Sequence, residues 1–256
     1  MKEEHSERLP AYIPNTGESE AIQKFKLEWR NQNFHGSVMT WMTLIFLVIL
    51  FPGVNIVFTE DPVSMLESLD NTMRLILFIS TIVIQWFIFL FIFGTVYTEN
   101  TGLAGLGFKR LRLLDFFWAA AFFGATLLAL SGLALLLELL GIPMLGELKF
   151  LIPQNTTGRI VWVFLSLTAG ICEETAFRGY LMTRIRLVGK FQTWVIPAII
   201  SALVFGSLHT YQGLPGFIVI TVYGAMFSLL FIYTKSIWPG IIAHFFQDFI
   251  NLFIPQ

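Results

Sequence analysis

The sequence has little charge and almost no cysteine. Only 13% of the 256 residues are Asp, Glu, Lys or Arg, and the formal net charge is −1. A chain without an excess of positive charge offers no case for binding nucleic acid. The single cysteine, Cys172, excludes an internal disulfide and says little about the compartment.

Apolar residues are correspondingly abundant. They make up 55% of the chain, including 27 Phe, which is more apolar surface than a soluble domain can bury. Seven apolar stretches are each long enough, or nearly so, to cross a hydrocarbon core about 30 Å thick as a helix. The stretches are approximately 38–58, 75–97, 116–140, 160–182, 194–209, 215–233 and 237–253. The sequence therefore predicts an all-α fold, a polytopic integral membrane helical bundle of about seven transmembrane helices that lies in the lipid bilayer.

The chain divides into a short tail and one membrane domain. Residues 1–36 are polar and mixed in charge, and they lack the apolar core and cleavage site of a signal peptide. This composition predicts a soluble tail with a short interfacial helix at 22–29. Residues 37–256 form the predicted membrane domain, in which no internal repeat is visible.

The positions of Lys and Arg in the loops predict the orientation. With the N-terminus in the cytoplasm, ten basic residues lie in inside segments and three in outside segments. The ten are Lys24, Lys26, Arg30, Lys109, Arg110, Arg112, Arg184, Arg186, Lys190 and Lys235; the three are Arg74, Lys149 and Arg159. This bias predicts a multi-pass protein of the cell (cytoplasmic) membrane, with the N-terminus inside and the C-terminus outside.

Three ionisable residues interrupt the fourth apolar stretch. They are Glu173, Glu174 and Arg178, and an ionised side chain near the bilayer centre costs roughly 2.5–3.5 kcal/mol on insertion scales. Glu174 and Arg178 are four residues apart, so they share a helix face, whereas Glu173 points about 100° away. The spacing predicts that Glu174 and Arg178 neutralise each other and that Glu173 can act as a base. The alternative is a structural ion pair at a helix contact.

Two later apolar stretches carry histidine. His209 follows Phe205 by four residues, and His244 precedes Asp248 by four. The Asp248 carboxylate could therefore accept the imidazole N–H of His244 and orient the ring. A lone histidine is more typical of an interfacial or hydrogen-bonded side chain, but the group of ionisable residues on three helices indicates chemistry. Gln85 and Glu138 are isolated polar residues and receive no role.

These motifs resemble those of the CAAX protease and bacteriocin-processing membrane proteins, also called the Abi or CPBP family. The resemblance rests on Glu173-Glu174-x-x-x-Arg178, Phe205-x-x-x-His209 and His244-x-x-x-Asp248, in this order, within residues 159–253. It implies an intramembrane endopeptidase, a hydrolase that cuts membrane-associated peptide or protein substrates.

The resemblance also implies roles for the residues of the motifs. Glu173 would be the general base, Glu174 and Arg178 would support it, and His209 would help to hold the water. His244 and the final motif residue would face the oxyanion. An ionised Asp248 cannot donate a hydrogen bond. Asp248 is therefore expected to orient His244, and the His244 imidazolium is expected to donate the hydrogen bond to the oxyanion.

No cofactor is expected. The alternative is zinc held by Glu173, His209 and His244, although the sequence contains no His-Glu-x-x-His arrangement. Two other functions stay open, namely a non-catalytic immunity or binding member of the same family and a proton-coupled transporter. The absence of a repeat and of an interrupted pair of helices argues against transport.

Helix depth gives one further expectation. For His209 to reach the depth of Glu173, the fifth helix must be short and start near Pro197, with residues 189–196 along the interface. The turn at 211–215 would then lie within the membrane, where protein or water must line it.

Overall fold

The computed structural model describes residues 34, 36–53, 69–142 and 152–253. All regular structure in these ranges is helical, without strands, which confirms the all-α prediction. Almost all of the predicted tail at 1–36 lies outside the described residues. The first helix, α2 (Val38–Ile45), begins at Ser37, whose hydroxyl accepts from the N–H of Thr40, and it continues as a π-helical turn, η1 (Phe46–Leu50).

The remaining elements follow the predicted apolar stretches closely. They are α5 (Asn71–Thr98), the 3-10 turn η2 (Leu103–Leu106), α6 (Leu113–Leu139), α7 (Thr156–Glu174), the π-helical segment η4 (Thr175–Met182), α8 (Thr183–Val188), α9 (Val195–Ser207), the 3-10 turn η5 (Thr210–Gln212), α10 (Gly213–Thr234), α11 (Trp238–Ile250) and the 3-10 turn η6 (Asn251–Phe253). Segments α7, η4 and α8 form one continuous helical stretch, Thr156–Val188.

Four of the described helical stretches are long and apolar enough to cross a membrane. They are Asn71–Thr98, Leu113–Leu139, Thr156–Val188 and Thr210–Thr234, and they fit a multi-pass membrane protein. The stretch Val38–Gly53 and helix α9 are shorter and apolar. With 13 residues, α9 spans only about 20 Å, less than the core of a bilayer. The short fifth helix agrees with the depth argument, whereas seven crossings stay a prediction.

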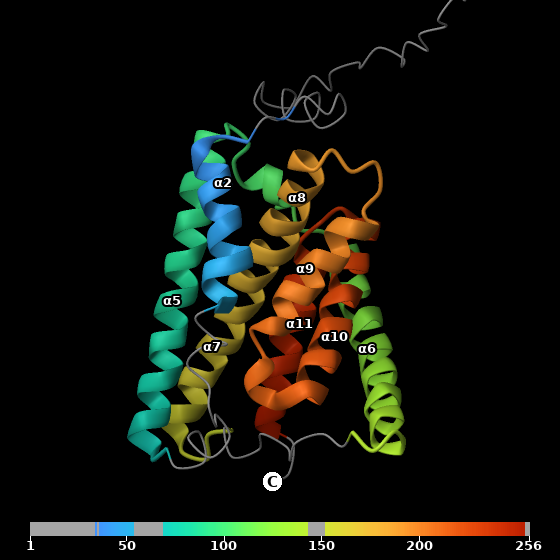
Figure 1. Ribbon diagram of the computed structural model, residues 1–256. Helices are drawn as coiled ribbons and strands as arrows, with labels where there is room; N and C mark the ends of the chain where they lie inside the picture. The colour runs from blue at the N-terminus through green and yellow to red at the C-terminus, as the bar shows by residue number, and fades with distance from the viewer. Residues whose placement is uncertain (1–33, 35, 54–68, 143–151, 254–256) are drawn as a thin grey trace, which may run out of the picture.

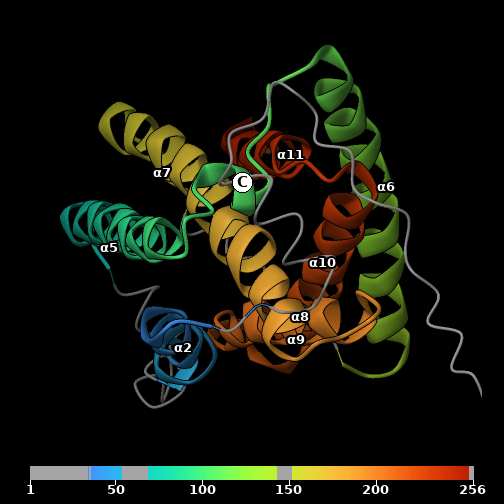
Figure 2. The ribbon, with the colours of Figure 1, turned by 90° about the horizontal axis from the view of Figure 1, so that it is seen from above.

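Consecutive helical stretches alternate in direction, with α7, η4 and α8 counted as one stretch (Figure 1). The α5–α6, α8–α9 and α10–α11 connections lie at one end of the bundle, and α9 and α10 join before they reach the far ends of α6 and α7 (Figure 1). Helix α7 packs against α5 on one side and α11 on the other, and α11 also packs against α6. Seen along the bundle, α7 therefore stands between α5 and the group of α6, α10 and α11 (Figure 2).

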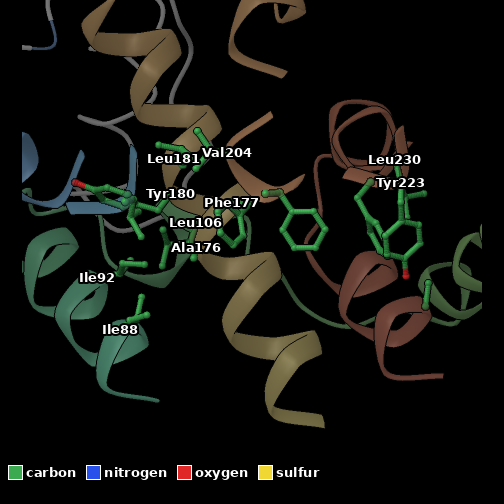
Figure 3. Close-up of a cluster of buried hydrophobic side chains, with 14 of the residues drawn as sticks. Ile88, Ile92, Leu106, Ala176, Phe177, Tyr180, Leu181, Val204, Tyr223 and Leu230 are labelled. Atoms are coloured by element: carbon green, nitrogen blue, oxygen red, sulfur yellow. The ribbon is translucent and has the colours of Figure 1, made fainter. Parts of the chain in front are cut away.

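The core surrounds the end of α7 and all of η4. Every residue of η4 is buried, and Figure 3 shows its side chains between those of α5 and α10. A π-helix changes the backbone hydrogen-bond register and can leave a carbonyl unpaired. The hydroxyl of Ser201 on α9 donates to the carbonyl oxygen of Phe177 at 2.8 Å, so α9 supports this irregular segment.

Small residues let the helices around the core approach closely. A Cβ at Gly170 would lie 2.8 Å from the carbonyl oxygen of Ile241 on α11, and a Cβ at Gly179 would lie 2.8 Å from that of Leu106. Small residues are typical of places where membrane helices approach closely. At Gly170 and Gly179 the neighbouring backbone leaves no room for a larger side chain.

Gly170→Ala should therefore destabilise the protein. The added methyl would push α7 and α11 apart, and overpacking of this kind typically costs about 1–3 kcal/mol. Gly94→Ala on α5 is the matched control, because a Cβ there meets nothing within 4 Å and alanine favours a helix. Thermal unfolding in detergent would compare the two; a Gly170→Ala protein as stable as the control would contradict the close contact.

Most of the described basic residues lie at one end of the bundle. Lys109, Arg110 and Arg112 lie in the α5–α6 connection, and Lys190 and Lys235 lie in the α8–α9 and α10–α11 connections. Arg184 at the same end is fully buried and pairs with Glu99 at 2.6 Å. It is therefore part of the buried interior and a weak guide to orientation.

We predict that this basic end faces the cytoplasm. A reporter inserted in the connection that contains η2 should report the cytoplasmic side, and a reporter fused to the C-terminus should report the opposite side. A third reporter within 143–151 should agree with the C-terminal fusion. The same side for the first two reporters would contradict seven crossings.

Candidate active site

Glu174 is the centre of a buried polar cluster. Its Oε1 lies 2.8 Å from Nη1 of Arg178 and 3.1 Å from Nδ1 of His244. The Glu174 and Arg178 side chains are only 2% and 1% exposed. The predicted ion pair between them is confirmed, and it extends across to α11 through His244.

The Arg178 guanidinium is fixed on several sides. Its Nη2 donates to the carbonyl oxygen of Gly224 on α10 at 3.2 Å. Its Cζ lies 4.5 Å from the ring centre of Phe205 and 4.9 Å from that of Phe227. These cation–π and hydrogen-bond contacts partly replace the lost hydration. Arg178 therefore links α7, α9 and α10 around Glu174.

Glu173 is more open than Glu174, as the helix geometry predicted. Its side chain is 19% exposed. Its Oε2 lies 3.7 Å from Nε2 of His244, and its Oε1 accepts from Nε2 of Gln85 on α5 at 2.7 Å. Glu173 thus faces the exposed side of the cluster while Glu174 is enclosed.

Gln85 is a site residue that sequence reasoning missed. It stood alone in an apolar stretch, and nothing local connects it to a residue 88 positions away. The sequence did carry one signal: a glutamine lies within an apolar membrane helix. An amide in that setting needs a polar partner on another helix.

His244 is oriented by Glu174, and not by Asp248 as expected. The Asp248 carboxylate is 3.7 Å from Nε2, beyond hydrogen-bond distance, while Nδ1 takes the contact with Glu174. Nε2 of His244 consequently faces both Glu173 and Asp248. With its side chain 36% exposed, Asp248 lies at the open side of the cluster.

His209 lies just after α9, before the turn η5, and contacts Phe205, whose ring lies between it and the cluster. Its Nδ1 is 3.1 Å from the carbonyl oxygen of Phe205, and since a carbonyl only accepts, Nδ1 must carry the proton. Nε2 is then the nitrogen that can serve a water or a substrate. The Phe205 ring centre lies 5.1 Å from that of His209 and 6.4 Å from that of His244.

A hydrogen-bonded chain beside His244 ties three helices together. Tyr223 on α10 donates to Oε1 of Gln247 on α11, and Nε2 of Gln247 donates to Thr126 on α6 at 2.7 Å. The Tyr223 ring centre is 6.1 Å from that of His244. The sequence motifs did not point to this chain.

The described residues do not present a ready metal site. Among them, no three His, Cys, Asp or Glu side chains are grouped as metal ligands. The donor set considered from the sequence, Glu173, His209 and His244, is therefore not arranged around a metal position here.

The buried Glu174–Arg178 pair on a candidate membrane-spanning stretch, with His244 of α11 beside it, places a cluster of ionisable groups inside a multi-pass membrane protein. Residues 155–250 match the family model described as type II CAAX prenyl endopeptidase Rce1-like. This region, which runs from the start of α7 to the end of α11, is similar to the CAAX protease family, and that similarity points to an intramembrane protease. No significant match was found among curated proteins or among solved structures.

Proposed function

We propose that this protein is an intramembrane endopeptidase that hydrolyses peptide bonds of membrane-associated peptides or proteins, using a water activated by Glu173. The observation that carries the proposal is the pairing of a partly exposed Glu173 with a buried Glu174–Arg178–His244 cluster. A structural ion pair needs one carboxylate only, and the second one, Glu173, faces Nε2 of His244.

In the proposed reaction, Glu173 takes a proton from a water. The water oxygen forms a bond to the scissile carbonyl carbon, and the carbonyl oxygen becomes an oxyanion. The C–N bond then breaks, and the proton held by Glu173 passes to the leaving amine. His209 Nε2 would help to hold the water, because its Nδ1 already donates to Phe205.

The oxyanion requires a hydrogen-bond donor. We assign this role to Nε2 of a protonated His244, since its Nδ1 is held by Glu174 and its Nε2 faces Glu173. Glu174 would stabilise the imidazolium and fix the ring, and Arg178 would hold Glu174. Asp248 would add negative charge beside Nε2 and favour the protonated ring.

We propose that this chemistry needs no metal. The carboxylate base and the imidazole donor supply both proton transfer and charge stabilisation, and the zinc alternative lacks a grouped donor set among the described residues. Cleavage that persists after chelation and is not raised by added Zn²⁺ would support this. Loss on chelation with recovery on Zn²⁺ would contradict it.

The proposal can be tested with the purified protein in liposomes and a peptide panel. The panel would contain one C-a-a-X peptide in farnesylated and unprenylated forms and a set of membrane-anchored peptides. In water enriched in oxygen-18, at least one peptide should be cut and should carry one heavy oxygen in its new carboxylate. A folded protein that cuts no member of the panel would overturn the proposal for these substrate classes.

A further inference from the structure

Gln85 makes a direct contact with the proposed base but belongs to none of the motifs. It lies on α5, outside the matched residues 155–250, and its Nε2 donates to Oε1 of Glu173 at 2.7 Å. The contact crosses from α5 to α7, so it joins the site to a part of the chain to which the family match gives no role.

The stability of the fold does not account for this amide. The Oε1 of Gln85 is buried and has no hydrogen-bond partner among the described residues, and a buried unsatisfied acceptor is destabilising. An apolar side chain would suit the apolar helix α5 better. A residue that weakens the fold and touches a reactive carboxylate is typical of a functional site.

Gln85 is not needed to join α5 to α7. Nε1 of the neighbouring Trp86 donates to the hydroxyl of Thr168 on α7 at 3.2 Å, and the two helices pack along their length. The Gln85 contact therefore orients the Glu173 carboxylate and contributes little to the attachment of α5 to α7.

We propose that Gln85 is a positioning residue for catalysis, an inference that rests on the proposed function. By donating to Oε1, the amide fixes the rotation of the Glu173 carboxylate. Oε2 is then held toward Nε2 of His244 at 3.7 Å, in the position where the proposed water and oxyanion meet. Without the donor the carboxylate can rotate, and fewer molecules hold the reactive geometry.

Gln85→Met tests the proposal, because methionine is similar in length but cannot donate. With the best-cleaved panel peptide as the probe, kcat should fall about 10- to 100-fold, the effect of losing a hydrogen bond to a charged group. KM should change less than threefold, and the melting temperature should not fall. Trp86→Phe is the matched control: it removes the neighbouring α5–α7 hydrogen bond, to Thr168, and should leave kcat within about twofold.

Three results would overturn the proposal. A Gln85→Met protein with wild-type kcat would show that Glu173 is positioned without the amide. A lower melting temperature with an equal loss in Trp86→Phe would show that Gln85 only holds the helices together. If the wild-type protein cuts no peptide while both variants fold, the proposed function itself fails, and the role of Gln85 fails with it.

Discussion

Glu173→Gln should abolish proteolysis while the protein folds as before. The substitution keeps the size of the side chain and removes the proposed base, and general acid–base catalysis contributes about 10²- to 10⁴-fold. Glu173 is partly exposed and makes no ion pair with an arginine among the described residues, so its neutralisation leaves no buried charge unpaired. We expect kcat/KM to fall about 1,000-fold, with the melting temperature nearly unchanged.

Glu138→Gln is the matched control for this prediction. Glu138 is exposed near the end of α6, away from the cluster, and its amide variant should keep wild-type turnover. Wild-type cleavage by Glu173→Gln would remove the base from the mechanism. A Glu173→Gln protein that fails to fold would show that Glu173 has a structural role.

Glu174→Gln should destabilise the protein as well as inactivate it. The variant leaves Arg178 buried without its ion-pair partner, and breaking a buried pair typically costs about 3–5 kcal/mol. It also removes the charge that holds Nδ1 of His244. The expected result is a large loss of thermal stability in detergent together with a loss of peptide cleavage.

Two further variants separate these effects. Glu174→Gln/Arg178→Met removes both charges and should recover part of the stability but none of the activity. Glu99→Gln breaks a second buried ion pair, with Arg184, and should reduce stability while the remaining folded protein still cuts peptide. If Glu174→Gln is stable and Glu173→Gln is the variant that unfolds, the two roles are reversed.

The sequence predicted those parts of the structure that depend on residues close in the chain. Apolar stretches at 75–97 and 116–140 lie within α5 (Asn71–Thr98) and close to α6 (Leu113–Leu139), because the thickness of a bilayer fixes the length of an apolar helix. The pair Glu174–Arg178 followed from a spacing of four residues on one helix, even though the segment that carries Arg178 is π-helical.

Contacts between distant helices could not be read from local spacing. His244 and Asp248 are four residues apart, yet Nδ1 of His244 contacts Glu174, 70 positions earlier. The choice depends on how α11 packs against α7, where Gly170 lets the backbones meet. The Gln85–Glu173 hydrogen bond depends in the same way on the packing of α5. Local spacing therefore predicted most of the site residues, but the contacts between these residues depend on how the helices pack.

The central claim is that this membrane protein hydrolyses peptide bonds through Glu173. The most direct measurement compares, by mass spectrometry, the membrane peptides of cells that contain the wild-type protein with those of cells that contain Glu173→Gln at equal abundance. The account predicts a set of new peptide C-termini that appear only with the wild-type protein and that the purified enzyme reproduces on synthetic peptides. Identical peptide sets in the two kinds of cell would contradict it.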